Sequence, residues 1–457
     1  MKHLKIHFLG GVGTVTGSKF YLELEDYGIL VDCGMFQGAK SLREENWKPL
    51  PIDVSKINTV LLTHGHFDHV GYLPLLVKQG FKGKVLGTAP TLEIAEIILK
   101  DSAKIQEEEA EKANKEGFSK HKPALPLYTI DEVEETLRFF KAIEPGKWIP
   151  LSPAGHKVRF RFNGHILGST FIELDLHEKR FVFSGDLGRL QDDLLDAPIR
   201  PNWADYLFIE STYGNKNHPH EALESIFVDM VKHTIRKRSA LIIPTFAVER
   251  LQSVMYLLWK LYDKNVIPNI PIFVDSPMGI NVLEIFGRFP KWHKLSEKEY
   301  RNMCNHVHLV SSYAQTWETI DDPRPKIVIA GSGMVTGGRV LTYLKQLVDN
   351  PDTTVILVGF QAEGTRGRQL LEGAHEIKLM GKYCPVNATV LHLESLSAHA
   401  DQQELLHWID EIKNIPEKIF LVHGETTALD AFRTKIVDEK KWRCHIPQLH
   451  EIVTLAL

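Results

Sequence analysis

A short run of metal-ligand residues near position 65 constrains the fold more than any other stretch of the chain. His64, His66, Asp68 and His69 fall within six residues, directly after the apolar run 60–62. Three imidazoles and a carboxylate placed this closely would cost solvation energy if buried, and would repel one another when protonated, unless a cation held them together. Nitrogen and carboxylate ligands suit zinc. We therefore expect a buried strand that opens into a loop of metal ligands.

Length and composition indicate a globular protein with more than one domain. The chain has 457 residues, of which 43% are hydrophobic and 25% charged, so two or three domains are expected. Its four cysteines are widely spaced and include no Cys-x-x-Cys pair, which argues against a disulfide framework or a thiolate metal site. The formal net charge of -4 argues against a uniformly basic surface, so a polyanion would need a local groove.

Nothing in the sequence predicts a membrane partner. The longest apolar runs, such as 241–243 and 354–358, are strand-sized and far shorter than a bilayer span. The N-terminus carries no apolar segment followed by a cleavage site. We therefore predict a cytoplasmic location.

The N-terminal part predicts strands and helices around the histidine cluster. Alternating or apolar residues predict strands over 5–9, 18–25, 29–34 and 84–87. Helical periodicity predicts helices over 71–78, 91–113 and 131–141. Asp32 falls near the end of one predicted strand. It is interpreted either as an ordinary turn residue or as a partner that orients the histidine cluster.

Two more ligand candidates follow a second set of predicted strands. The segments 157–162, 171–176 and 180–183 have strand character. His165 lies in the turn after the first of them and Asp186 just past the last. Because the earlier candidates also follow a strand, we expect both residues to be metal ligands.

The middle of the chain has a different architecture. After a strand that closes at Glu210, four apolar strands each lead through a loop into a helix; they begin near 241, 271, 326 and 354. Such a succession predicts an open parallel sheet with helices on its faces. We expect this part to form a second domain.

A glycine-rich loop in that domain is a candidate phosphate site. The segment 331–339 combines glycines with Ser332, Gly333 and Arg339, so a phosphate could approach the backbone beside a hydroxyl and a guanidinium. Arg250 and Arg366 occupy comparable loop or helix-start positions. In open parallel sheets, ligands bind at these strand ends. A glycine-rich turn without a ligand is the alternative.

The last segment returns to strands followed by histidines. A strand over 388–393 precedes His399, and a strand over 418–422 precedes His423, with a helix over 402–413 between them. This strand-helix-strand unit would complete the first domain. We therefore predict a first domain formed by 1–212 and 385–457, with 213–384 as an insertion.

As a set, these residues resemble the metallo-β-lactamase superfamily and, within it, the β-CASP ribonucleases, which include bacterial RNase J and the pre-mRNA 3′-end-processing endonuclease. The resemblance covers nearly the full length. The superfamily motifs match at Asp32, at His64-x-His66-x-Asp68-His69, at His165 and at Asp186, and the β-CASP motifs match at Glu210, His399 and His423. It implies a metallo-β-lactamase αββα sandwich with an inserted β-CASP domain that contains a parallel sheet flanked by helices.

The resemblance also implies roles for these residues. Two zinc ions per chain, with manganese as an alternative metal, would be held by His64, His66 and His165, by Asp68, His69 and His423, and by Asp186 as a bridge. His399 would protonate the departing oxygen or steady the phosphoryl charge, and Glu210 would orient it. Asp68 would be catalytic as well as a ligand, and Asp32 would orient the cluster from outside it.

The implied function is a zinc-dependent ribonuclease that uses metal-activated hydroxide on single-stranded RNA. RNA is favoured over DNA because the DNA-repair branch of the family lacks a histidine where this chain has His423. The chain ends at Leu457 without the additional C-terminal domain of RNase J, so endonuclease action is expected, with 5′ exonuclease action and a homodimer left open.

Two alternatives to this function remain. A small-molecule ester or thioester hydrolase on the same zinc scaffold would give no role to Glu210 or His399. A non-catalytic RNA-binding scaffold is the other alternative, and the complete set of expected ligands argues against it.

Overall fold

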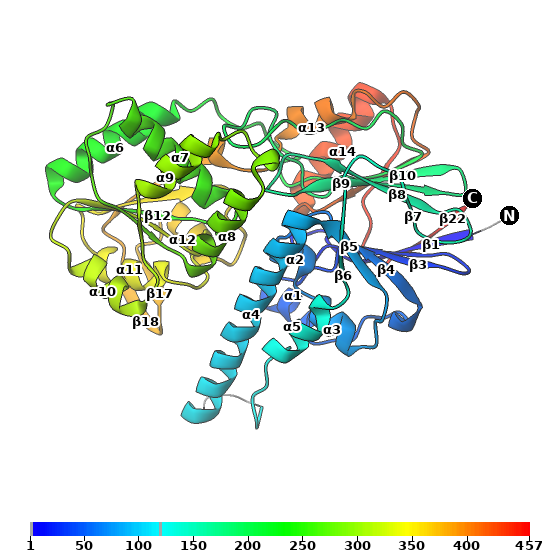
Figure 1. Cartoon of the computed structure of the whole chain (residues 1–457), viewed down its shortest axis with the longest axis horizontal. Helices are drawn as coiled ribbons and strands as arrows, with labels where there is room; N and C mark the ends of the chain where they lie inside the picture. Colours follow the sequence, from blue (N-terminus) through cyan, green and yellow to red (C-terminus); the bar gives the residue numbers. More distant parts are fainter. Residues whose placement is uncertain (1–2, 118–120) are drawn as a thin grey trace. The chain divides into compact units, whose positions relative to one another are not determined.

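The computed structural model describes residues 3–117 and 121–457. The chain divides into two compact units, one formed by 1–217 together with 399–457 and the other by 218–398. The colours of Figure 1 follow the chain from the first unit into the second and back again. Each unit has its own sheets and its own hydrophobic core.

The first unit contains two mixed sheets. One has the strand order β22 (Ile452–Ala456), β1 (His3–Gly10), β2 (Lys19–Glu23), β3 (Gly28–Val31), β4 (Ile57–Leu61), β5 (Lys84–Thr88), β6 (Phe140–Ile143). The other has the order β21 (Cys444–His445), β20 (Lys418–Val422), β11 (Tyr206–Glu210), β10 (Lys179–Phe183), β9 (Thr170–Leu176), β8 (Lys157–Phe162), β7 (Ile149–Pro150). In both sheets, antiparallel pairs give way to parallel pairs toward one side.

Aromatic side chains fill the space between these two sheets. Phe8 and Phe20 come from the first sheet, and Phe183, Phe208 and Phe420 come from the second. The rings of Phe183 and Phe208 stack with centroids 4.0 Å apart, and those of Phe208 and Phe420 with centroids 4.7 Å apart. Such large buried rings contribute much of the apolar area that stabilises a sandwich.

Helices cover the outer faces of the sandwich, as Figure 1 shows. The N-terminal helices are α1 (Lys40–Glu45), α2 (Phe67–Val70), α3 (Leu73–Lys78), α4 (Ala89–Glu116) and α5 (Ile130–Leu137), and α4 contacts β5 and β6. Helices α13 (Gln402–Ile409) and α14 (Thr426–Lys440) pack on the second sheet through Trp408, Leu429 and Phe432. The expected αββα sandwich is therefore confirmed. No helix within 3–117 or 121–457 is both long and apolar enough to cross a bilayer.

One predicted helix is shorter than its periodicity indicates. The helix expected over 131–141 ends at Leu137, and β6 begins at Phe140. Phe140 pairs with Val85 of β5 in parallel register. Residues 140–143 therefore form a strand, because the hydrogen bonds to the edge of the sheet outweigh their weak helical preference.

The second unit is built on an all-parallel sheet, as predicted. Its strand order is β14 (His308–Leu309), β13 (Ile272–Asp275), β15 (Lys326–Ala330), β12 (Ala240–Pro244), β16 (Thr354–Val358), β19 (Thr389–Leu393). The helices of this unit are α6 (Leu223–Lys237), α7 (Arg250–Asp263), α8 (Pro277–Arg288), α9 (Glu297–Asn305), α10 (Tyr313–Asp321), α11 (Val340–Leu347) and α12 (Arg366–Leu371), and β17 (Glu376–Leu379) pairs with β18 (Lys382–Pro385). Buried strands of this kind are nearly continuous apolar runs because both faces are covered.

The strand over 389–393 belongs to this second unit and does not complete the first, which differs from our expectation. β19 runs parallel to β16, with five successive residue pairs from Thr354 with Thr389 to Val358 with Leu393. The inserted unit therefore ends at Ala398 rather than near residue 384. A strand sequence alone does not state which sheet edge it will join, because either edge can satisfy its backbone groups.

Candidate metal centre

The carboxyl ends of neighbouring parallel strands bring the candidate ligands together. In the first sheet β3 and β4 are parallel neighbours, and Asp32 and His64 follow them. In the second sheet β10, β11 and β20 are parallel neighbours, and Asp186, Glu210 and His423 lie at their ends. Parallel strands end at the same edge of a sheet, so residues far apart in sequence meet there.

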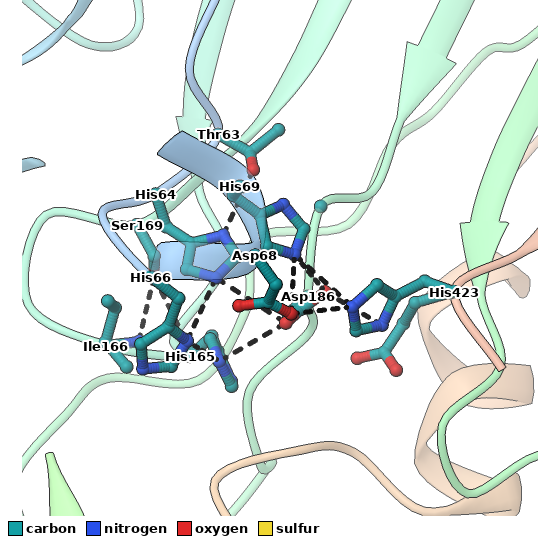
Figure 2. Close-up of polar contacts among 12 residues, drawn as sticks. Thr63, His64, His66, Asp68, His69, His165, Ile166, Ser169, Asp186 and His423 are labelled. Carbon is teal, nitrogen blue, oxygen red and sulfur yellow. Dashed lines mark hydrogen bonds and ion pairs between the residues drawn. The ribbon is translucent and has the colours of Figure 1, made fainter. Parts of the chain in front are cut away.

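Three histidines and one carboxylate form the first ligand group. One ligand atom each from His64, His66, His165 and Asp186 lies within 4.8 Å of all the others. The Nδ1 atom of His66 is 3.1 Å from Nε2 of His64 and 3.2 Å from Nε2 of His165. Figure 2 shows these side chains pointing toward one another.

A second group lies beside the first and shares Asp186 with it. Its members are Asp68, His69, Asp186 and His423, again with ligand atoms within 4.8 Å of one another. The Nε2 atoms of His69 and His423 are 3.4 Å apart, and Nε2 of His423 is 3.3 Å from Oδ2 of Asp68. Asp68 and His69 both come from α2, which begins directly after the His-x-His pair.

The two carboxylate oxygens of Asp186 face different groups. Its Oδ2 lies 3.5 Å from Nε2 of His64 and 3.6 Å from Nε2 of His165. Its Oδ1 lies 3.3 Å from Nε2 of His69 and 3.3 Å from Nδ1 of His423. This carboxylate can therefore serve both groups at once, which is the geometry of a bridging ligand.

Asp32 fixes the orientation of His69 from outside the cluster. Its Oδ2 lies 2.8 Å from Nδ1 of His69 and accepts a hydrogen bond from the Thr63 hydroxyl, while its Oδ1 accepts from the Thr63 backbone N–H. With Nδ1 bound to a carboxylate, Nε2 of His69 is directed at the cluster. Asp32 and His423 have φ values of 57° and 47°, and such strained backbones cluster at functional sites.

Three further polar side chains that the sequence did not single out support the ligands. The Ser169 hydroxyl accepts hydrogen bonds from the backbone N–H groups of His165 and Ile166, both at 3.1 Å. The Asn163 amide donates to the carbonyls of Ser184 and Asp186. The Thr212 hydroxyl lies 3.3 Å from Nδ1 of His423. Each lies within a few residues of a histidine or acidic candidate, and that proximity is the signal that could have identified it.

Burial keeps two of the histidines neutral. It lowers the pKa of His64 well below the usual value, and the neighbouring His69 lowers it further. It also lowers the pKa of His66 to about 4, although Asp68 and Asp186 oppose the shift. A neutral imidazole has the free lone pair that a metal requires.

When no cation is present, neighbouring charges favour the ionised form of Asp186 and the protonated form of His69. Burial opposes the charged form of Asp186, but His423, His69 and His64 outweigh it and hold the pKa of that carboxyl well below its usual value. Burial likewise disfavours charge on His69, yet Asp186, Asp32 and Asp68 raise its pKa well above the usual value. A metal ion would therefore have to displace the proton of His69.

The donor set fits divalent metal ions. The two groups offer mixed imidazole nitrogen and carboxylate oxygen atoms, which zinc and manganese accept. Nearly all of these side chains are buried, and charged or polar groups buried this densely are stable only when they are paired or coordinate an ion. The described part of the chain thus holds two adjoining groups of candidate metal ligands that share Asp186, and Asp186 also forms a third group with Glu210 and His399.

His399 and Glu210 lie alongside the first group. Oε1 of Glu210 is 3.3 Å from Nδ1 of His399 and accepts a 2.6 Å hydrogen bond from the Leu187 backbone. The ring of His399 lies 4.5 Å from that of His165, centroid to centroid. Burial disfavours charge on His399, but Glu210 and then Asp186 raise its pKa above the usual value. The pairing with Glu210 therefore favours the protonated, proton-donating form of His399.

The predicted phosphate-binding loop lies at the end of β15 in the second unit. The Ser332 hydroxyl accepts hydrogen bonds from the backbone N–H groups of Thr336 and Gly337. A side chain at Gly333 would collide with the ring of Phe246, which explains the glycine there. The loop is therefore compact, with Ser332 inside its turn.

The three predicted phosphate-binding arginines have intramolecular partners. Arg366 donates to the carbonyls of Val335 and Thr336, so it braces the loop itself. Arg339 donates to the Thr316 hydroxyl at 2.6 Å and stacks over the ring of Tyr313 at 3.8 Å. Arg250 is buried and donates to the carbonyl of Leu396. Arg366 thus contacts the predicted loop at Val335 and Thr336, whereas the side chains of Arg339 and Arg250 bond to other segments.

Three family models match the chain in order. The metallo-beta-lactamase superfamily matches residues 13–218, the Beta-Casp domain matches 251–370, and the Zn-dependent metallo-hydrolase RNA specificity domain matches 383–447. Together these matches span both units.

Curated relatives align along nearly the whole chain. The ribonuclease TTHA0252 of Thermus thermophilus is 33% identical over 433 residues, which cover 93% of this chain and 94% of that protein. The transcription termination factor FttA of Methanocaldococcus jannaschii is 29% identical over 465 residues, covering 97% of this chain and 70% of that protein.

A solved structure shares the fold at low identity. A protein of unknown function from Enterococcus faecalis superposes with a TM-score of 0.54 and 13% identity, over 99% of this chain and 100% of that one. The similarity at this level concerns the fold alone.

Proposed function

The chain belongs to the β-CASP ribonuclease family of metallo-β-lactamase-fold hydrolases, and on that premise we propose that it is a zinc-dependent endonuclease that cuts single-stranded RNA. One observation carries the proposal: two ligand groups share Asp186, and the ion-paired His399 and Glu210 lie beside them. A ligand set of this kind, with a separate proton donor, is what hydrolysis of a phosphodiester requires.

Each ligand group would hold one zinc ion. The first ion would be held by His64, His66 and His165, the second by Asp68, His69 and His423, and Asp186 would contact both. When bound, zinc supplies Lewis acidity and lowers the pKa of water at the site. Manganese fits the same oxygen and nitrogen donors.

His399 would supply the proton for the departing oxygen. Its Nδ1 pairs with Glu210, and its Nε2 would donate a proton to the 3′ oxygen of the leaving nucleotide. Glu210 favours the protonated form of His399 and fixes its ring, while the other oxygen of Glu210 accepts a hydrogen bond from the Thr212 backbone N–H. We therefore assign His399 as the general acid and Glu210 as the residue that positions it.

Asp68 would act as both ligand and catalytic residue. Its side chain is 16% exposed, whereas those of His69 and Asp186 are each 2% exposed. His69 and His423 keep its carboxyl ionised by lowering its pKa against the effect of burial. An ionised and partly accessible carboxylate can accept a hydrogen bond from the attacking water and orient it.

The relatives and the sequence support RNA as the substrate. One relative is named a ribonuclease, and the model that matches 383–447 is named an RNA specificity domain. The presence of His423 argues against the DNA-repair branch. Phosphates of the strand would be bound by Ser332, Gly333 and Arg366, with Arg250 and Arg339 as further candidates. A cytoplasmic location, 5′ exonuclease action and a homodimer remain predictions from the sequence.

Cleavage of labelled nucleic acids tests this function directly. Zinc-loaded protein is given 5′-labelled RNA, internally labelled RNA, matched single-stranded DNA and a chromogenic ester. We expect cleavage inside the RNA and little action on the DNA or the ester. His399→Ala should slow RNA cleavage by at least about 100-fold while the bound metal, measured by mass spectrometry, stays unchanged.

An exposed histidine provides the matched control for this experiment. His407 lies on α13 with its side chain 46% exposed, so His407→Ala should cleave RNA at the normal rate. Glu210→Gln should give a rate between those of the two alanine variants, because it keeps a hydrogen-bond acceptor for His399 but removes the charge. Undiminished RNA cleavage by His399→Ala, or faster hydrolysis of the ester than of RNA, would exclude the proposal.

A further inference from the structure

A cavity in the first unit lies outside the ligand groups described above. It is partly open to solvent and has a volume of about 180 Å³, comparable to that of engineered cavities that take a benzene-sized molecule. Leu9, Phe36, Leu50 and Tyr72 form much of its wall, and Lys19 also lines it. The cavity therefore combines an apolar wall with one ammonium group.

Lys19 is buried with one hydrogen-bond donor unused. Its residue is only 1% exposed, and its Nζ donates to the carbonyls of Gly34 at 2.6 Å and Gly17 at 3.1 Å. The same atom lies 4.4 Å from the ring centroid of Phe36 and 5.1 Å from that of Tyr72. An ammonium has three donors, and no third acceptor for Lys19 occurs among residues 3–117 and 121–457.

No carboxylate in the described ranges neutralises this charge. Within 3–117 and 121–457, Lys19 forms no ion pair, and its hydrogen-bond acceptors are the two backbone carbonyls. Burial lowers the pKa of Lys19 to about 8, which still leaves it protonated at pH 7. Two carbonyls and two ring faces offset part of the cost of burying this charge, and a bound anion would offset more of it.

The charged residues at the edge of the cavity would not repel an anion. Glu45 lies 2.5 Å from Nζ of Lys48 and 3.9 Å from Nε2 of His450. These three residues line the cavity together with Lys19. Because Lys48 neutralises the one carboxylate, the lining as a whole is positively charged.

We propose that this cavity, the Lys19 pocket, binds a small monocarboxylate with a flat or short apolar body. The carboxylate of the ligand would accept a hydrogen bond from the third N–H of Lys19. The apolar part of the ligand would lie against Phe36, Tyr72 and Leu50. Inorganic phosphate is disfavoured because the apolar wall would leave most of its oxygen atoms without donors. The proposal does not depend on the ribonuclease function.

The Lys19 pocket adjoins the backbone that carries Asp68. The Nζ of Lys19 donates a hydrogen bond to the carbonyl of Gly34. The Gly34 N–H donates to the carbonyl of Ser18, and the Ser18 N–H donates to the carbonyl of Asp68. An occupied pocket would therefore stabilise the same loops that position the second ligand group.

Calorimetric titration with benzoate tests the proposal, and benzamide is the neutral probe of equal shape. Full-length protein should bind one equivalent of benzoate and should bind benzamide at least about tenfold more weakly. Lys19→Met should abolish this preference, and Leu50→Trp should abolish binding of both probes by filling the pocket. Lys40→Met, which removes a lysine whose side chain is 80% exposed, should bind benzoate normally.

Several outcomes would overturn the proposal. They are an absence of saturable benzoate binding up to about 10 mM, equal affinity for the two probes, and unchanged affinity in Leu50→Trp. If Lys19→Met fails to fold, Leu50→Trp and the comparison of benzoate with benzamide decide the question by themselves.

Discussion

At the scale of single residues, the site depends on side chains that hold the ligands as much as on the ligands. The carboxylate of Asp32 lies 2.8 Å from Nδ1 of His69. It also accepts hydrogen bonds from the backbone N–H and the hydroxyl of Thr63. It is 1% exposed, so its loss would leave those buried groups without partners. Partners of this kind fix the tautomer and the direction of a ligand histidine.

We predict that Asp32→Ala weakens zinc binding by about 10- to 100-fold. The reason is that His69 loses the carboxylate that directs its Nε2 into the cluster. Competition with a chromogenic chelator would measure the change, and Asp26→Ala, at an exposed turn of the first unit, is the matched control. Equal zinc affinity of Asp32→Ala and Asp26→Ala would refute the orienting role.

Zinc affinity should also depend on pH through His69. In the metal-free protein the pKa of His69 is raised well above 6.5, so zinc must displace its proton, and affinity should rise as pH rises toward that pKa. The proton contributes stability to the metal-free protein that is fully present below pH 6.5 and lost as pH rises through the raised pKa. Chelator competition at several pH values, corrected for the chelator's own protonation, would reveal this trend, and a flat profile would contradict it.

At the scale of elements, close backbone packing between loops sets the positions of the ligands. Gly34 follows Asp32 and packs directly against α2: a Cβ built there would lie 1.5 Å from the carbonyl oxygen of Asp68 and 2.7 Å from the nitrogen of His69. Backbone segments this close tolerate only glycine. The loop after β3 and the start of α2 therefore form one packed unit.

Gly34→Ala should accordingly separate these segments and impair the second ligand group. We expect a loss of at least about 2 kcal/mol in the free energy of unfolding and loss of one equivalent of bound metal. Chemical denaturation and metal analysis would measure both. Gly337→Ala is the control, since nothing lies within 4 Å of a Cβ there; if the two variants behaved alike, the packing argument would fail.

The strand-end rule explains why much of the site could be predicted from the sequence. His64, Asp186 and His423 each follow a short apolar strand, and ends of parallel strands meet at one edge. The supporting residues Asn163 and Ser169 were not predictable in this way, because their roles depend on which backbone groups the turn leaves unpaired. The burial of Lys19 was equally hidden, since a lysine in an alternating strand is usually exposed.

At the scale of the whole molecule, the chain inserts one α/β unit into another. The prediction of an inserted parallel sheet was sound because apolar strands alternated with helices over a long stretch. The end of the insertion was placed near residue 384, whereas the second unit continues to Ala398. The difference arises because β19 pairs with β16, and the paired residues are more than thirty positions apart in sequence. The local sequence of a strand does not predict which distant strand it will pair with.

The central claim is that two metal ions share Asp186, and metal stoichiometry in native mass spectrometry tests it most directly. The unaltered chain should carry two zinc ions. His165→Ala and His423→Ala remove a ligand from only one group each, so each should retain one ion, whereas Asp186→Ala should weaken both sites. A single zinc ion in the unaltered chain, or loss of both ions in either histidine variant with Asp186→Ala unaffected, would contradict the account.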